Sequence, residues 1–347
     1  RGQHDRNLWA KNFRNEIIKN PNFPIIKQSV NLELTNHELP KFFYDSTPCP
    51  YRQKGGSVEA EKLLQSFLNK RGENYQFEMS SPITAEKSCS RLSTHLTYGT
   101  ISHRTVFQEA AKKRDLIKHT NKNFAKSINS FLSRLHWRSH FIQKLEDQPS
   151  IEHTSFIPVY DQIREKDEEK LEAWIEGKTG VHFIDACMIY LRNYGWINFR
   201  MRAMLASFAS YNLWLDWRYF APRLAALFTD FEPGIHYSQI QMQSGTTGIN
   251  TIRMYNPYKQ AMDQDPLAKF IKSQIPEVKN FPPAFFHNPP KKSLNVNLFD
   301  NEFQKEIINV KETAQYARKK IFDIRKSQEH KILAKNVYLK HGSRGRS

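Results

Sequence analysis

The feature that most constrains this fold is a long stretch of helical apolar spacing from Ile184 to Phe228. Apolar side chains recur there every three or four residues, with few glycine or proline interruptions. An upstream segment, 128–147, repeats the amphipathic helical pattern. No run of residues alternates convincingly between apolar and polar side chains, as a half-buried strand would. The sequence therefore predicts an all-α fold.

Composition shifts along the chain predict three parts. Residues 1–56 are polar and dotted with Asn and Pro, which is typical of an extended arm or interdomain linker, and one short helix is expected over 8–19. Residues 57–280 form the predicted helical domain. Residues 281–347 begin with a Pro-rich connection and continue as a basic C-terminal helix, expected over 302–337 and packed on the domain.

The charge balance points to a polyanionic partner. The chain carries 52 Lys and Arg against 35 Asp and Glu, a net charge of +17. Residues 311–347 alone hold 11 basic against 3 acidic side chains. Such a surface attracts nucleic acid or an acidic protein assembly. The basic helix is either a solvated surface or a docking element for such a partner, and charge does not choose between nucleic acid and protein.

Cysteine usage predicts neither a disulfide framework nor a metal site. The three cysteines, Cys49, Cys89 and Cys187, lack CxxC spacing, so no metal is expected and an intracellular reducing compartment is favoured, whether cytoplasm, nucleus or plastid. No apolar run approaches the roughly 20 residues that cross a bilayer, so no transmembrane segment is expected. The sequence begins with Arg1 and not Met, which predicts that an upstream segment has been removed or lies outside it.

Two blocks of sequence carry a family resemblance. One is SRLSTHLTYGTISHR at 90–104, and the other runs from 174 to 278 through GWINFRMR, LDWRYF, FTDFEPG and RMYNPYKQ. In this order and spacing they resemble the FAD-binding helical domain of the photolyase/cryptochrome family. The likeness extends over residues ~57 to ~340 and is similar to short members from bacteria and cyanobacteria that lack the N-terminal α/β antenna domain.

The resemblance implies FAD as the cofactor and assigns residues to its phosphates. Ser90, Arg91, Leu92 and Ser93 fall on the family's phosphate-binding loop, where hydroxyl and backbone N–H groups ahead of a helix would meet a pyrophosphate. In the family, a Trp–Arg pair lies on the helix beneath the substrate cavity, with the Arg near the phosphates. In this chain the Arg is Arg138.

Near the flavin ring the family keeps an Arg–Asp salt bridge. Arg202 and Asp230 fit it best, while Arg200 and Glu232 are also available, and Glu232 is counted among the cofactor-binding residues. Retention of both partners favours a working site, because a buried ion pair is costly unless it is fully hydrogen-bonded. His236 takes the position of an Asn beside the reactive nitrogen, where it either handles a proton or is simply hydrogen-bonded in a polar pocket.

Other positions depart from the family pattern. Ile240 replaces the first Trp of the photoreduction chain, whereas Trp217 keeps the middle one as an electron-transfer residue. In the substrate cavity, Trp137 is kept, but Arg134 replaces an acidic residue and Met242 replaces a stacking aromatic. Losing a stacking face and a carboxylate weakens the recognition of a flipped base, so these changes argue against conventional pyrimidine-dimer repair.

Two functions remain open from the sequence. The first is an FAD-binding, cryptochrome/photolyase-like flavoprotein with blue-light-driven electron transfer or signalling, which is a carbon–carbon lyase only if the repair chemistry is retained. The alternative is a non-enzymatic structural or linker subunit of a large acidic assembly, for example a plastid photosynthetic antenna complex or a ribonucleoprotein. The loss of the first Trp of the photoreduction chain and the basic C-terminal region favour the structural subunit. The residues retained at the family's flavin-binding positions favour the flavoprotein.

Overall fold

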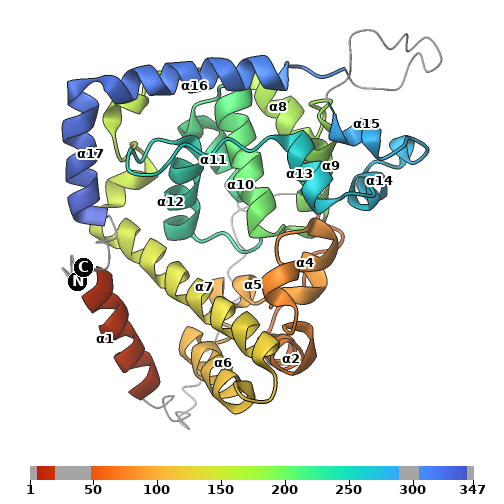
Figure 1. Ribbon diagram of the computed structural model, residues 1–347, viewed down its shortest axis with the longest axis vertical. Coiled ribbons are helices and arrows are strands. Elements are labelled where there is room, and N and C mark those ends of the chain that lie inside the picture. The colour runs from red at the N-terminus through yellow and green to blue at the C-terminus, as the bar shows by residue number, and fades with distance from the viewer. Residues whose placement is uncertain (1–5, 20–47, 289–304, 342–347) are drawn as a thin grey trace, which may run out of the picture.

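The computed structural model describes residues 6–19, 48–288 and 305–341 (Figure 1). Regular structure in these ranges is helical throughout and contains no β-strand. The only strand-like pairing there is an isolated bridge between Glu165 and Leu215. The predicted all-α fold is therefore confirmed, and the helix expected over 8–19 is present as α1. Within the same ranges no helix is both long enough and apolar enough to cross a membrane.

The α-helices in these ranges are α1 (Arg6–Lys19), α2 (Ser57–Ser66), α3 (Tyr75–Glu78), α4 (Pro82–Ser88), α5 (Ser93–Thr97), α6 (His103–Ile117), α7 (Lys122–Asp147), α8 (Glu168–Glu176), α9 (His182–Tyr194), α10 (Phe199–Ser207), α11 (Trp217–Ala226), α12 (Pro233–Ser244), α13 (Pro257–Gln264), α14 (Lys269–Gln274), α15 (Ala284–His287), α16 (Val310–Lys326) and α17 (Gln328–His341). Two π-helical turns, at Phe67–Arg71 (η2) and Phe208–Asn212 (η5), directly follow α2 and α10.

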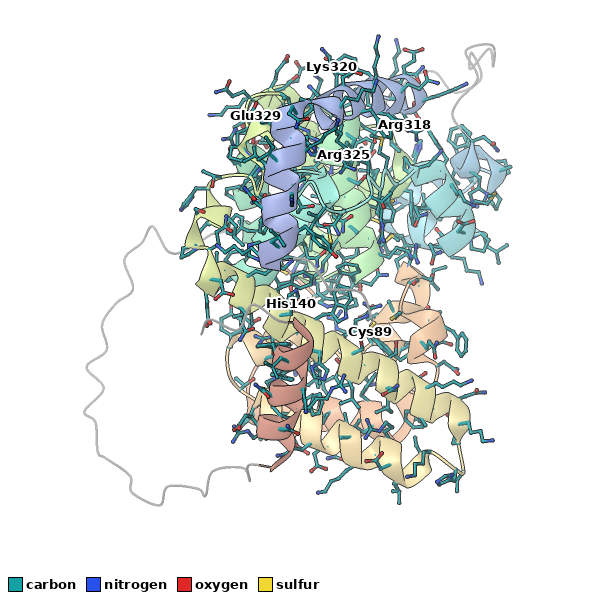
Figure 2. The ribbon with its side chains drawn as sticks, turned by 60° about the vertical axis from the view of Figure 1, so that its left-hand side comes forward. Cys89, His140, Arg318, Lys320, Arg325 and Glu329 are labelled. Atoms are coloured by element: carbon teal, nitrogen blue, oxygen red, sulfur yellow. The ribbon has the colours of Figure 1, made fainter. Side chains whose placement is uncertain are left out.

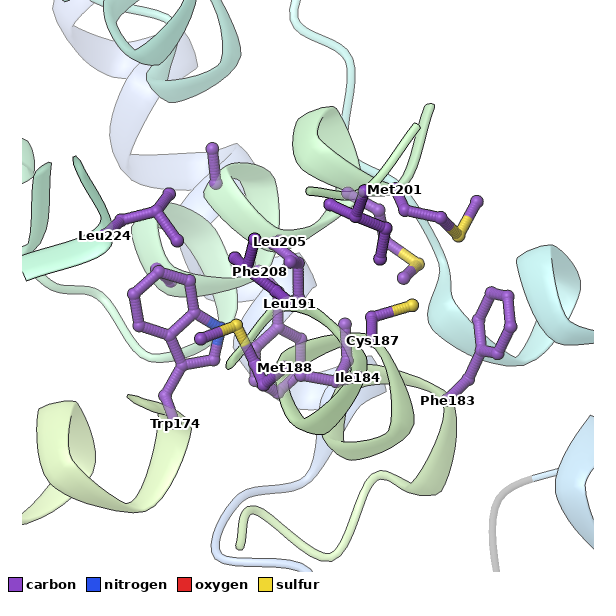
Figure 3. Close-up of a cluster of buried hydrophobic side chains, with 14 of the residues drawn as sticks. Trp174, Phe183, Ile184, Cys187, Met188, Leu191, Met201, Leu205, Phe208 and Leu224 are labelled. Atoms are coloured by element: carbon purple, nitrogen blue, oxygen red, sulfur yellow. The ribbon is translucent and has the colours of Figure 1, made fainter. Parts of the chain in front are cut away.

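The largest apolar core lies where α8, α9, α10 and α11 meet (Figure 3). Trp174 of α8 and Met188 of α9 are fully buried there, together with Leu205 of α10. This is the stretch whose helical spacing is continuous in the sequence, so each helix presents an apolar stripe to the others. A second core joins α6 and α7 through Phe107, Ile128 and neighbouring apolar side chains.

Side-chain caps fix where the central helices begin. Asn121 Oδ1 accepts a hydrogen bond of 3.0 Å from the backbone N–H of Phe124 and starts α7. Asp216 Oδ1 accepts one of 2.9 Å from Arg218 N–H and starts α11. Helices α7 and α12 approach each other closely, since a Cβ added to Gly234 of α12 would lie 2.6 Å from the Cα of Ile142 in α7. Glycine is therefore needed at this helix crossing.

The C-terminal region differs from its prediction. A single basic helix was expected over 302–337, but the structure has two, α16 and α17, which turn a corner at Ser327 (Figure 1). Ser327 is extended, with φ −63° and ψ 147°, and its hydroxyl accepts a hydrogen bond of 3.2 Å from His330 N–H. Serine therefore acts as a helix-starting cap in mid-sequence. Ala317 and Ile321 are buried in a cluster with Ile157, Tyr160 and Tyr211, so this face of α16 packs on the rest of the helical region.

Candidate functional site

Three segments that are far apart in the sequence meet between α7, α10 and α12. The hydroxyl oxygens of Thr94, in α5, and Thr229 lie 3.4 Å apart. Thr229 N–H also donates a 2.9 Å hydrogen bond to the carbonyl of Gly195. Gly195 has φ 64°, and a Cβ there would lie 2.5 Å from the methyl group of Thr229, so this junction requires glycine. The predicted cofactor residues lie in the segment before and at the start of α5, inside α7 and α10, and in and just before the first turn of α12.

Arg202 and Asp230 form the ion pair that the resemblance favours. Arg202 Nη2 lies 2.8 Å from Asp230 Oδ2, and Arg202 Nε donates a 2.7 Å hydrogen bond to the carbonyl of Ile197. The Arg202 guanidinium lies 4.2 Å from the centre of the Phe228 ring. The Asp230 side chain is only 4% exposed, and its second oxygen, Oδ1, is buried with no hydrogen-bond partner among the described residues. The pair therefore keeps one buried acceptor open.

Arg138 and Glu232 form a second pair beside the first. Arg138 Nη2 lies 3.2 Å from Glu232 Oε2 and 3.3 Å from the carbonyl oxygen of Leu96, so it ties α7 to both α5 and the start of α12. Burial lowers the pKa of Arg138, and the carboxylate of Glu232 opposes that shift. Glu232 thus pairs with Arg138 and leaves Asp230 to Arg202. We call Arg138, Arg202, Asp230 and Glu232 the arginine–carboxylate cluster.

Arg91 is held in a conformation that few residues adopt. Its φ is 62°, in the left-handed region, and its guanidinium lies 3.9 Å from the centre of the Trp196 ring. Arg91 is 9% exposed, burial lowers its pKa, and Nη1 is buried with no hydrogen-bond partner among the described residues. A buried cation with an open donor, held in a strained backbone, is a feature of binding sites.

The other predicted loop residues surround Arg91 but differ in environment. Ser90 Oγ accepts a 3.4 Å hydrogen bond from Leu92 N–H, and Ser93 is the first residue of α5. Leu92 is 1% exposed and packs into the core shared by α6 and α7, so its side chain anchors the loop. No side chain caps the start of α5.

His236 is a neutral imidazole among aromatic rings. Its Nε2 lies 2.9 Å from the carbonyl oxygen of Ala221, and because a carbonyl can only accept, Nε2 carries the hydrogen and Nδ1 is the acceptor. The rings of Phe231 and Tyr237 have centres 5.3 and 5.2 Å from that of His236. Burial, reinforced by the charge of Arg202, lowers the pKa of His236 to about 4. The imidazole is therefore an uncharged proton acceptor at neutral pH.

Trp217 lies deep in the core and touches one redox-capable ring. It is 1% exposed, and its Nε1–H donates a 2.9 Å hydrogen bond to Ser155 Oγ. The ring of Tyr237 lies edge-on to it, with 6.4 Å between centres. Ile240, on the same helix as Tyr237, is buried and aliphatic.

The predicted substrate-cavity residues lie on two helices, α7 and α12. Arg134 and Trp137 are neighbours on α7, with the guanidinium 6.0 Å from the ring centre. Met242 is partly buried on a different helix, α12. A cavity of about 500 Å³ is lined by Trp137, but neither Arg134 nor Met242 lines it.

Sequence reasoning missed the residues that connect the predicted ones. Trp196 stacks under Arg91, Thr229 joins α5 to the 195 turn, and Ala221 supplies the carbonyl that sets the His236 tautomer. Trp196 had a usable signal, because the GW dipeptide lies two residues before the FRMR segment. Ala221 contributes through its backbone carbonyl and Thr229 through a small hydroxyl group. Neither contribution can be recognised from a single sequence.

An all-helical domain with this cluster at the meeting point of α5, α7, α10 and α12 defines the class of fold. Comparison with known proteins gives the family: residues 131–330, more than half of the chain, match the family described as the FAD binding domain of DNA photolyase. The chain belongs to this family. The predicted FAD-binding, photolyase/cryptochrome-like identity is confirmed, FAD is the cofactor that the family description names, and the structural-subunit alternative is not favoured.

Individual relatives agree with this. The chain is 30% identical over 243 residues to a deoxyribodipyrimidine photo-lyase of Streptomyces griseus, covering 70% of this chain and 50% of the relative. It is 30% identical over 290 residues to Cryptochrome-2 of Arabidopsis thaliana, covering 79% of this chain and 46% of that one. The chain thus spans about half the length of the curated relatives it matches.

Solved structures share the fold. An archaeal photolyase from Sulfolobus tokodaii, whose structure contains two FAD molecules, is 30% identical with a TM-score of 0.62, covering 78% of this chain and 57% of that one. A cryptochrome from Synechocystis sp. PCC6803 has a TM-score of 0.70, covering 81% and 58% respectively. Its identity of 21% supports the likeness of fold alone.

Proposed function

We propose that the chain holds FAD through the arginine–carboxylate cluster together with Arg91 and the loop Ser90–Ser93. The observation that carries this is a pair of unsatisfied buried groups, Arg91 Nη1 and Asp230 Oδ1. One is a cationic donor that suits a phosphate, and the other is an acceptor that suits an N–H on a polar ring edge. A dinucleotide with a flat ring at one end offers both, so the residues present fit the group.

Bound FAD would supply absorption of blue light and exchange of electrons. This chain's own residues would set its surroundings. Arg202 and Asp230 hold each other in place, so that Asp230 Oδ1 has a fixed direction. His236 supplies a neutral acceptor at Nδ1, because its other nitrogen donates to Ala221. Trp217 and Tyr237, which touch edge to face, are the proposed electron-transfer pair in place of a route through Ile240.

We further propose that the activity is light-driven electron transfer or signalling and not conventional pyrimidine-dimer repair. Arg134 brings a cation where the resemblance expects an acid, and Met242 offers no flat face for stacking. The test is photorepair of an oligonucleotide with one thymine dimer, under blue light and with a reductant. We expect no repair above the rate without protein, and dimer loss that requires both light and this chain would contradict the proposal.

The proposed partner is polyanionic. Arg318, Lys319 and Lys320 of α16 are exposed. Arg318 and Lys320 are labelled on this helix in Figure 2. Binding to DNA and to poly-glutamate at several salt concentrations tests it, because counterion release makes affinity fall steeply with salt. Affinity for neither polymer at low salt would contradict it.

The decisive experiment for the cofactor is an absorption spectrum of the purified chain before and after blue light with a reductant. We expect a structured band near ~450 nm, typical of bound oxidised flavin, that bleaches on illumination. Asp230→Ala should lose the band. Asp263→Ala, which removes an exposed carboxylate paired with Lys259, should keep it. A colourless chain that FAD cannot reconstitute would contradict the proposal.

A further inference from the structure

A cavity of about 500 Å³ lies between α1, α6 and α7. Its walls come from residues of all three helices, among them Trp9 and Arg14 of α1, Phe107 of α6, and Ser133 and His136 of α7. Figure 2 shows α1 lying against α7 beside His140, which is another wall residue. The volume is within the range of small-molecule sites, roughly 300–1,000 Å³.

This cavity is separate from the proposed flavin site. Two residues that are two positions apart in an α-helix point about 200° apart around the helix axis. His136 and Arg138 therefore point to opposite sides of α7, and Arg138 is tied to Leu96 and Glu232 on the far side. None of the four residues of the arginine–carboxylate cluster lines the α1–α7 cavity.

The walls offer flat aromatic faces on a fixed frame. Trp9, Phe107 and Trp137 all line the cavity. Behind them, Phe13 holds α1 in place, with its ring centre 4.8 Å from that of His136 and 6.1 Å from that of Phe107. A planar heterocycle that entered would be able to stack on the aromatic walls, a contact that every nucleobase can make.

The polar groups that line the cavity favour a ligand that carries a negative charge and a ring able to form hydrogen bonds. No Asp or Glu is among the lining residues, which include Arg14 and Arg114. Arg114 forms an ion pair with Asp115, with Nε 2.9 Å from Oδ1. Its charge is therefore partly neutralised, and Arg14 is the better candidate to bind an anion. His136 Nδ1 is buried with no hydrogen-bond partner among the described residues, and Ser133 adds a hydroxyl. Burial lowers the pKa of His136 to about 4, so its ring is neutral.

We infer that the α1–α7 cavity binds a nucleotide unit, with the base stacked on its aromatic walls and the phosphate on Arg14. An apolar ligand would leave His136 Nδ1 unsatisfied, and a metal cation would meet arginine without any carboxylate. The same chemistry is offered by a free mononucleotide and by one nucleotide of a single strand. These are two sources of one ligand class.

The test is calorimetric titration of the FAD-saturated full chain with AMP and, separately, with adenosine. Saturation with FAD keeps AMP out of the flavin site. We expect saturable AMP binding, with adenosine about tenfold weaker because it lacks the phosphate. Arg14→Ala should weaken AMP binding about tenfold, to the level of adenosine. Ser133→Trp, a change at an exposed helix position on the cavity wall, should fill the cavity and abolish binding.

Arg318→Ala is the matched control, because it removes an exposed arginine on α16 and should change nothing. Equal affinity for AMP and adenosine, no effect of Arg14→Ala and Ser133→Trp, or no saturable binding would each overturn the inference. Competition with a short single-stranded oligonucleotide identifies the source. Stronger binding by the strand assigns the site to a polynucleotide, and weaker binding assigns it to free mononucleotides. The flavin band, recorded on the same sample, reports separately on the proposed cofactor site.

Discussion

The two sides of α7 contain different kinds of site. On one side, Arg138 joins the arginine–carboxylate cluster, whose charges are paired inside the molecule and tie α5, α10 and α12 together. On the other side, His136 faces the α1–α7 cavity, which is closed by a single helix from near the start of the sequence. The cluster therefore contributes to the stability of the domain, whereas the cavity is formed by packing α1 onto α6 and α7. Changes on the first side should lower the stability of the whole domain, and changes on the second should act locally.

The largest effect is expected from Asp230→Ala. Removing this carboxylate leaves the Arg202 guanidinium without its ion-pair partner, and breaking a buried pair in this way costs about 3–5 kcal/mol. The free energy of unfolding, measured by urea titration with circular dichroism, should fall by that amount. Asp263→Ala removes an exposed pair with Lys259 and should change it by less than about 0.5 kcal/mol. Equal stability of the two variants would refute the structural role of the cluster.

The next effect is a pH dependence carried by His236. Its pKa is about 4 in the folded chain and about 6.5 when unfolded, so the unfolded state takes up a proton first as pH falls. The stability that neutral His236 contributes is complete above pH ~6.5 and is lost between about 6.5 and 4, by about 3 kcal/mol.

His236→Asn should therefore flatten the loss of stability between pH 7 and pH 4.5. The comparison is His136→Asn, on the cavity side of α7, whose pKa is also lowered to about 4 but whose ring is less buried. We expect a smaller flattening for that variant. His153→Asn, at a side chain that is 78% exposed, serves as the control and should leave the slope unchanged. An unaltered slope in the His236 variant would rule out a neutral, buried imidazole.

Arg138→Ala should have a smaller effect than Asp230→Ala. It removes a charged hydrogen bond to Glu232 and another to Leu96, but both charged side chains stay near the surface, at 18% and 20% exposure. The expected loss is about 2 kcal/mol in the free energy of unfolding. Arg223→Ala is the matched control, since its pairs with Glu168 and Glu172 are exposed and should contribute less than about 0.5 kcal/mol. A loss no larger than that of the control would contradict the bridging role of Arg138.

The fold and part of the candidate site could be predicted from the sequence, but the packing of α1 and the corner between α16 and α17 could not. The all-α fold follows from continuous apolar spacing. Arg202 and Asp230 were indicated by the family resemblance of the FRMR and FTDFEPG segments, because the apolar pattern alone does not choose them over Arg200 and Glu232. The packing of α1 on α6 and α7 could not be predicted, because it depends on a contact between Phe13 and His136, which are more than a hundred residues apart in the sequence. The corner at Ser327 was missed for a local reason, since a serine within a helical pattern caps a new helix only when its backbone is extended.

The smallest global effect, and the one that most sharpens the contrast, is expected from Phe13→Ala. This ring fixes α1 by its contacts with His136, His103 and Phe107, while the largest apolar core lies where α8, α9, α10 and α11 meet. Losing it should release α1 with a change in global unfolding free energy below about 1 kcal/mol, because local opening costs less than global unfolding. Hydrogen exchange should speed up in α1 and stay unchanged in α9. Phe77→Ala, at an exposed ring of α3, should alter neither helix. If Phe13→Ala destabilised α9 as much as α1, the cavity side would be part of the core and the division of α7 into two functional sides would be wrong.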